Sequence, residues 1–168
     1  MRQPAPDQDA ITAKGVLRKE EGKQAFRLTL YEPHTDLRTW IEFYWSVEWD
    51  LGNKPFVQTV VTNPTIDLSF EDDAATNGHG ACLVATGVAP RSYKRVLRGR
   101  GDVFAAHFHP GMFRPWWGAS VNALTGAAER LGAGGRPWEA AAIQLLPALM
   151  TAPNDKRVAM LDALLLDH

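Results

Sequence analysis

This chain has almost no cysteine, no long apolar run and no excess charge of either sign. Its single cysteine, Cys82, excludes an intramolecular disulfide and a cysteine-rich zinc site. No stretch approaches the ~20 consecutive apolar residues that a membrane-spanning helix needs. The polar N-terminus also lacks an apolar run of signal-peptide length. We therefore expect a soluble, cytoplasmic protein with no membrane partner.

The charge balance and the absence of common catalytic motifs argue against nucleic-acid binding and against enzyme activity. The chain has 18 basic and 19 acidic residues, for a net charge of -1, and this balance does not suggest a nucleic-acid-binding surface. The sequence contains no G-x-S-x-G, no P-loop and no G-x-G-x-x-G, and we interpret the pair Asp72-Asp73 as solvated loop residues. We accordingly expect no enzyme activity, no catalytic residues and no cofactor.

Alternating apolar residues before position 110 predict a β-rich domain. The clearest strand spans residues 39–50, where five apolar residues recur at every second position and so argue against a helix. These residues are Ile41, Phe43, Trp45, Val47 and Trp49. Further short strands are expected at 26–30, 56–63, 66–70, 81–88, 92–97 and 102–109. Their spacing is close to the ~8–12 residues typical of a sandwich or barrel, and no helix-length segment interrupts them.

The pattern changes to helical spacing after Gly118. We expect a first helix over residues 120–132, a second that starts at Pro137 and is kinked or shortened by Pro147, and a third capped by Asn154.

The sequence therefore predicts three segments. Residues 1–24 are polar and are expected to be partly disordered. Residues 25–117 are expected to form a β-barrel domain, and residues 118–168 a helical C-terminal appendage.

Two histidines are the candidates for a metal site. His107 and His109 occupy positions i and i+2 of a strand, so both rings are expected to point the same way. Gly101 precedes them as in the first half of a cupin metal signature, G-x5-H-x-H. No glutamate follows at the required spacing, and the only later histidine is His168. We treat them as weak metal candidates and favour two ordinary strand histidines.

Other side chains suggest a ligand pocket. Trp45 and Trp49 share one strand face, which either lines a small-ligand pocket or forms plain core. Arg95 belongs to a basic segment that is either a solvated strand face or an anion-binding site. The candidate ligand-binding residues are Trp45, Trp49, Arg95, His107 and His109. The pair Trp116-Trp117 is expected to cap the barrel or to anchor a helix onto it.

The order of several motifs resembles the N-terminal domain of a group of AraC-type transcriptional regulators. The resemblance covers about residues 37–168. It rests on Tyr44-Trp45, on Pro64 with the segment 67–70, on Gly87-Val88 and on the segment 108–113. It implies a cupin-like antiparallel β-barrel, or double-stranded β-helix, followed by two or three α-helices. In such proteins the barrel senses a small effector, the helices often mediate dimerisation, and a separate C-terminal helix-turn-helix domain binds DNA.

We therefore expect the effector-sensing and/or dimerisation domain of an AraC-type regulator. We expect it to be a homodimer with an unknown small-molecule effector, and the DNA-binding part to lie outside these residues. Two alternatives remain open. One is a cupin-type metal-dependent oxygenase or isomerase that uses His107 and His109. The other is a purely structural dimerisation module.

Overall fold

A computed structural model describes residues 25–74, 78, 80–132 and 135–168. The segment for which we predicted partial disorder, residues 1–24, lies outside this range. The strands are β1 (Arg27–Tyr31), β2 (Ile41–Asp50), β3 (Phe56–Val60), β4 (Asp67–Asp72), β5 (Cys82–Thr86), β6 (Tyr93–Leu97), β7 (Arg100–Phe108) and β8 (Ala128–Leu131). The helices are α4 (Arg114–Trp117), α5 (Pro137–Thr151) and α6 (Asn154–Leu166), with 3-10 turns η1 (Thr35–Leu37) and η2 (Val121–Leu124).

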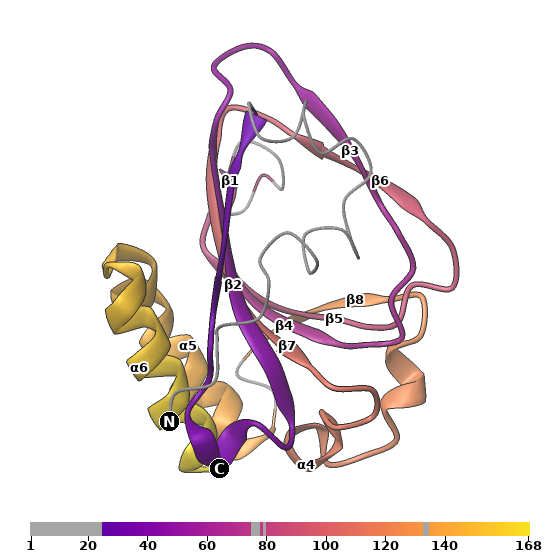
Figure 1. Ribbon diagram of the computed structural model, residues 1–168, viewed down its shortest axis with the longest axis vertical. Coiled ribbons are helices and arrows are strands. Elements are labelled where there is room, and N and C mark those ends of the chain that lie inside the picture. The colour runs from indigo at the N-terminus through magenta and orange to yellow at the C-terminus, as the bar shows by residue number, and fades with distance from the viewer. Residues whose placement is uncertain (1–24, 75–77, 79, 133–134) are drawn as a thin grey trace, which may run out of the picture.

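The strands form two antiparallel sheets. The larger has the order β1-β2-β7-β4-β5-β8, and the smaller pairs β3 with β6. In Figure 1 the β3–β6 ribbon stands across from the larger sheet, while α5 and α6 lie on the outer side of that sheet. The expectation of a mostly β protein with C-terminal helices is confirmed. Within the described residues, the strands belong to two separate sheets.

The main core lies between the larger sheet and the helices. Alternate residues of the sheet, such as Leu68, Phe70 and Phe104, are buried together with Leu149 and Leu161 of the helices. The remaining alternate residues point to the opposite face, toward β3 and β6. The period-two pattern of the sequence therefore separates a helix-covered face from a face directed at the second sheet.

The helix expected over residues 120–132 is not formed. Ser120 does cap a helical segment, but this segment is the short 3-10 turn η2. Gly126 then adopts a left-handed conformation with φ 74, which ends the helical path. The chain continues as β8, which pairs with the edge of β5. Hydrogen bonding to an existing sheet edge prevails here over an apolar pattern compatible with a helix.

The two C-terminal helices follow their predicted positions, with two corrections. Pro137 begins α5 as expected, but the helix continues through Pro147 to Thr151 and is not shortened. Asn154 is the first residue of α6 and does not cap it; its side chain instead donates to Glu48. None of the described helices is long and apolar enough to cross a membrane.

Aromatic residues of α4 attach α5 to the end of β7. Trp116 and Trp117 are both buried in the main core. The indole of Trp138 donates to the Trp116 carbonyl at 2.6 Å, and the Arg136 guanidinium lies 3.6 Å from the centre of the Trp117 ring. This arrangement agrees with the predicted anchoring role of the tryptophan pair, although the anchored helix is α5.

Candidate functional site

A cavity of about 510 Å³ lies between the two sheets. This volume falls within the range of about 300–1,000 Å³ that is usual for small-molecule sites. One wall is apolar and comes from β1 and β2, with Leu28, Leu30, Phe43, Trp45, Val47 and Trp49 among its residues. The polar lining comes mainly from β4 and β7 of the same sheet, from β6 of the smaller sheet and from the segment after β3. A cavity of this kind suits a molecule with one apolar and one polar side.

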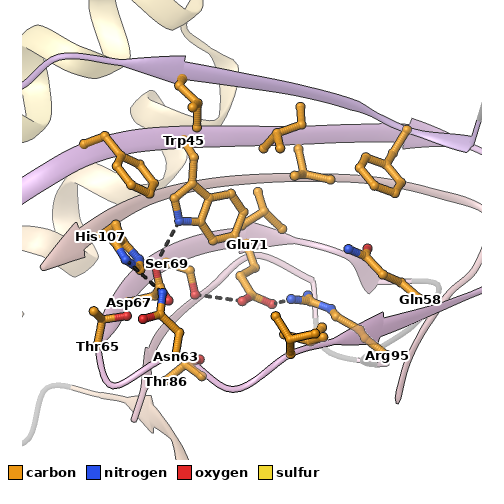
Figure 2. A pocket seen from close by; sticks show the side chains of 18 of the residues that line it. Trp45, Gln58, Asn63, Thr65, Asp67, Ser69, Glu71, Thr86, Arg95 and His107 are labelled. Atoms are coloured by element: carbon orange, nitrogen blue, oxygen red, sulfur yellow. Dashed lines mark hydrogen bonds and ion pairs between the residues drawn. The ribbon is translucent and has the colours of Figure 1, made fainter. Parts of the chain in front are cut away.

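His107 is at the centre of a polar cluster at one end of the cavity. Its Nδ1 is 2.8 Å from Oδ1 of Asp67, and that same oxygen accepts a hydrogen bond from the Trp45 indole at 2.9 Å. On the other side of the ring, Nε2 is 3.2 Å from Nδ2 of Asn63. Phe43 stacks on the imidazole with 4.5 Å between ring centres. Figure 2 shows the side chains of Trp45, Asn63, Asp67 and His107 converging at this end of the cavity.

Strand register explains why these residues meet. His107 lies in β7, between β2 and β4, and pairs with Phe43 on one side and with Asp67 on the other. Because directly paired residues of antiparallel strands point to the same face, all three side chains reach the cavity. The β2–β7 register shifts between Ile41 and Phe43, and this irregularity turns Glu42 toward the cavity as well.

The environment of His107 favours the protonated ring. Burial alone lowers the pKa of His107, but the hydrogen bond to Asp67 and the negative charges of Asp67 and Glu42 outweigh it and raise the pKa above its ordinary value. The side chain is 8% exposed. In the neutral ring, Nδ1–H donates to Asp67 and Nε2 accepts from the Asn63 amide. Below its raised pKa the ring is positively charged, with the carboxylates of Asp67 and Glu42 at 2.8 and 3.9 Å.

We expect the stabilising effect of His107 to weaken as the pH rises. The pKa of His107 is higher in the folded state than the ~6.5 of an unfolded chain. Its contribution to the free energy of unfolding is therefore complete below about pH 6.5, and it is lost as the pH rises through the folded-state pKa. His107→Gln should therefore lower the free energy of unfolding more at about pH 6 than at about pH 9. Urea denaturation at both pH values measures this difference.

A titration of the imidazole provides the control. In NMR spectra, the His107 resonances of the wild-type chain should titrate above about pH 6.5. In the Asp67→Asn variant they should titrate at lower pH, because the neighbouring carboxylate is lost. An unchanged midpoint in that variant would contradict the assigned role of Asp67.

A second polar cluster surrounds Arg95. Its Nη2 donates to Glu71 at 3.0 Å, and Glu71 also accepts a hydrogen bond from Ser69 at 2.7 Å. Asp73, 3.8 Å from the same guanidinium, is only 1% exposed, so the expectation that it is solvated was wrong. Asp72 is exposed as expected, but it is the last residue of β4 and not a loop residue. Another cavity, of about 520 Å³, shares Glu71, Tyr93 and Arg95 with the first. The Arg95–Glu71 ion pair thus belongs to the walls of both cavities.

Four of the five predicted ligand-binding residues line the first cavity, namely Trp45, Trp49, Arg95 and His107. The structure places His109 elsewhere. β7 ends at Phe108, and the His109 ring lies 3.2 Å from the Arg38 carbonyl oxygen. The two histidines are therefore not brought together in the cavity. In the part of the chain that the structure describes, no group of three or more His, Cys, Asp or Glu side chains is placed to hold a metal ion.

Sequence reasoning missed several polar residues of the cavity, above all Asp67 and Glu71. Both lie on one face of β4 together with Ser69, opposite the buried Leu68 and Phe70. The alternation of polar and apolar residues was visible in the sequence. It predicts which residues share a face, but it does not distinguish a face toward solvent from a face toward a cavity.

Comparisons with known proteins identify a family and no individual relative. No curated protein and no solved structure matches the chain significantly. A family model with the description "Domain of unknown function (DUF6597)" matches residues 29–129. This range contains all of β2 to β7, and therefore most of the cavity wall, and it ends before α5. Because the match covers more than half of the chain, the protein belongs to this family, the domains of unknown function designated DUF6597.

Proposed function

We propose that this chain is the effector-sensing domain of an AraC-type transcriptional regulator, built on a cupin-like β framework. The observation that supports the proposal most is that one sheet separates a cavity of about 510 Å³ from a pair of helices. Trp45 in β2 faces the cavity, whereas its neighbours Tyr44 and Ser46 are buried on the helix side. A ligand in the cavity therefore acts on strands that α6 contacts directly.

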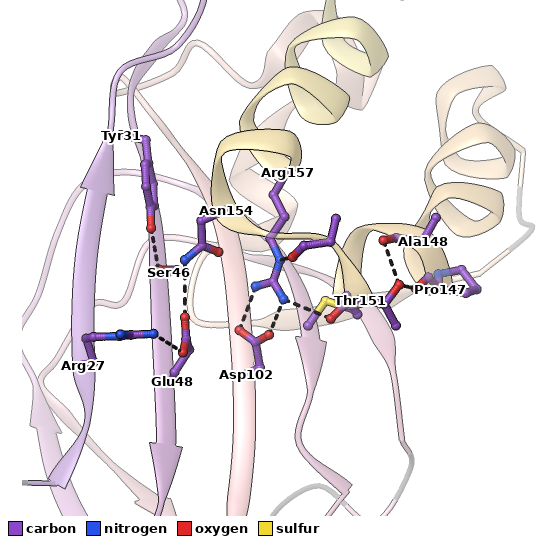
Figure 3. A network of polar contacts seen from close by, with 12 residues as sticks. Arg27, Tyr31, Ser46, Glu48, Asp102, Pro147, Ala148, Thr151, Asn154 and Arg157 are labelled. Atoms are coloured by element: carbon purple, nitrogen blue, oxygen red, sulfur yellow. Dashed lines mark hydrogen bonds and ion pairs between the residues drawn. The ribbon is translucent and has the colours of Figure 1, made fainter.

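Polar contacts join these strands to α6. The Tyr44 hydroxyl donates to Asp162 at 2.8 Å. Asn154 donates to Glu48, and Arg157 forms two hydrogen bonds with Asp102 of β7 (Figure 3). A ligand that prefers one arrangement of strands and helix shifts the population toward that arrangement. In this proposal, the helices form the dimer contact and pass the change to a DNA-binding domain.

Ligand-dependent stabilisation tests the sensing role. Screening the 168-residue chain against a broad metabolite library should give at least one compound that raises the melting temperature. A ligand at about 100 times its Kd adds about 2.7 kcal/mol to the free energy of unfolding. For a domain of this size that corresponds to a rise of roughly 5–10 °C. If no compound in the library stabilises the chain, the sensing proposal fails.

Substitution of Trp45 should show that the compound occupies this cavity. Trp45→Phe removes the indole donor to Asp67 and part of the apolar wall, so we expect Kd to rise about tenfold or more. Trp40→Phe is the matched control, because Trp40 packs against Trp116 outside the cavity. Calorimetric titration of both variants gives the comparison. Equal loss of affinity in the two would place the ligand elsewhere.

Two further measurements separate the alternatives. A purely structural dimerisation module would show the same sedimentation behaviour with and without the compound. Our proposal assigns no catalytic role to the cavity. Stoichiometric iron, manganese, nickel or zinc in the purified chain, lost in His107→Ala, would instead favour the metal-dependent enzyme.

A further inference from the structure

Negative charge exceeds positive charge in the wall of the first cavity. Three carboxylate side chains line it, from Glu42, Asp67 and Glu71, against two basic side chains, Arg95 and His107. The excess is negative whether or not His107 is protonated. An anionic ligand would add to an existing excess of like charge, whereas a cation would reduce it.

Of the three carboxylates, that of Glu42 is the one without a hydrogen-bonded basic partner among the cavity residues. Arg95 is 3.0 Å from Glu71, and His107 is 2.8 Å from Asp67, so each basic group already has a direct carboxylate partner. The Glu42 carboxylate is 3.9 Å from Nε2 of His107, which is too long for a hydrogen bond. Its side chain is 37% exposed, so it is within reach of a ligand that enters from solvent.

Aromatic rings stand beside this carboxylate. Phe43 follows Glu42 in β2 and is held in place by stacking on His107, and Trp45 is oriented by its hydrogen bond to Asp67. The negative faces of such rings attract a ligand cation, and their apolar area favours a flat hydrocarbon body. Trp49 extends the same apolar wall along β2.

A buried hydroxyl at the same end of the cavity has no partner. Thr65 is 6% exposed, and among the described residues its Oγ1 has no hydrogen-bond partner. Figure 2 shows Thr65 at the cavity end that also holds Asn63 and His107. Buried polar groups are normally satisfied, so this oxygen is a position where a ligand N–H group fits.

We propose that the cavity binds an organic cation, in which a primary or secondary ammonium group is attached to a flat apolar body. The ammonium group lies between Glu42 and Thr65, and the flat body lies along Phe43, Trp45 and Trp49. This inference rests on the proposed function, because it names the ligand class of the same site.

Three probes with one ring system and different charges test this ligand class. Tryptamine is a cation, tryptophol is neutral and indole-3-acetate is an anion. In calorimetric titrations of the full 168-residue chain, tryptamine should bind at least about tenfold more tightly than tryptophol, and indole-3-acetate should bind most weakly. Tryptophol binding as tightly as tryptamine, or indole-3-acetate binding more tightly, would overturn the proposal. So would the absence of binding by all three probes.

Two glutamate variants locate the effect. Glu42→Gln should bring the affinities of tryptamine and tryptophol close together, because the charge that distinguishes them is gone. Glu129→Gln removes the same charge from exposed β8, outside the cavity, and should leave the preference as in the wild type. If Glu42→Gln keeps the full preference for tryptamine, the cation is bound at another place and the proposal is wrong.

The metabolite screen distinguishes failure of this inference from failure of the proposed function. If only neutral or anionic compounds stabilise the chain, the proposed sensing function stands, but the proposed ligand class is wrong. If neither the three probes nor any library compound binds, both proposals fall together.

Discussion

Replacing Arg157 by leucine is expected to lower the free energy of unfolding by about 3–5 kcal/mol. The residue is only 5% exposed. Its two terminal nitrogens donate to the two oxygens of Asp102 at 2.9 and 2.5 Å. It also donates to the carbonyl oxygens of Met150 and Ala152, both at 2.9 Å. The side chain thus fastens the junction of α5 and α6 to β7 (Figure 3), and its loss leaves a carboxylate and two carbonyls without their donor.

Arg27→Leu is the matched control for this prediction. Arg27 also pairs with a carboxylate, Glu48, but its side chain is 71% exposed and that of Glu48 is 33% exposed. An exposed ion pair of this kind contributes about 0–1 kcal/mol. Urea denaturation followed by tryptophan fluorescence compares the two variants. Similar losses in both would show that the Arg157 contacts do not hold the helices to the sheet.

A double variant distinguishes two causes of the expected loss in stability: the unpaired carboxylate of Asp102 and the unpaired carbonyl groups. If the cost arises from leaving Asp102 partly buried and unpaired, replacing Asp102 by leucine in the Arg157→Leu background should restore part of the stability. No recovery would assign the cost to the carbonyl contacts of Met150 and Ala152.

Adding one methyl group at Gly87 should have the next largest effect. A Cβ at this position would lie 1.8 Å from the carbonyl oxygen of Leu124 and 2.4 Å from its carbonyl carbon. Both are backbone atoms, and the two segments are further joined by the hydrogen bond from the Gly87 N–H to the Ala127 oxygen. Gly87→Ala must therefore displace the backbone at the end of η2. We expect a loss of about 1–3 kcal/mol or more, as for other overpacked sites.

Gly132→Ala provides the control, because a Cβ there meets no atom within 4 Å. This variant should remain within about 0.5 kcal/mol of the wild type. Hydrogen exchange gives a local readout. In Gly87→Ala the amides that pair β8 with β5 should exchange faster, whereas those between β2 and β7 should change little. Equal exchange in β8 of both variants would contradict the assigned role of Gly87.

The positions of β1 to β7 could be predicted from the sequence to within a few residues, and the physical reason is local. In an extended chain, successive side chains point to opposite faces, so a strand with one apolar face carries its own period of two. Residues 39–50 illustrate this, since Phe43, Trp45, Val47 and Trp49 share the face predicted for them and line the cavity. Ile41, predicted on the same face, lies instead in the main core, because the register shifts between Ile41 and Phe43. The starts of α5 and α6 were recognisable for a similar reason. Pro137 suits a first helical turn, and Asn154 was expected at a helix start, although it is the first residue of α6 and not its cap.

Residues 120–132 show where local pattern is insufficient. Val121, Leu124, Ala128 and Leu131 share one face of a hypothetical helix, and the sequence also supplies a cap at Ser120. The choice between helix and strand depended on the left-handed backbone at Gly126 and on the edge of β5, where Leu131 pairs with Leu83. That edge lies more than forty positions earlier in the chain, and no window of local sequence contains it.

The composition of the candidate site depended on pairings of the same long range. Asp67 and His107 are forty residues apart, and they meet because β4 and β7 are neighbours with these two residues in register. His109, only two positions from His107, lies elsewhere because β7 ends between them. Alternation along the chain thus established which side chains share a face. The packing of β3 and β6 opposite the larger sheet established that this face encloses a cavity, because enclosure is a property of distant strands brought together.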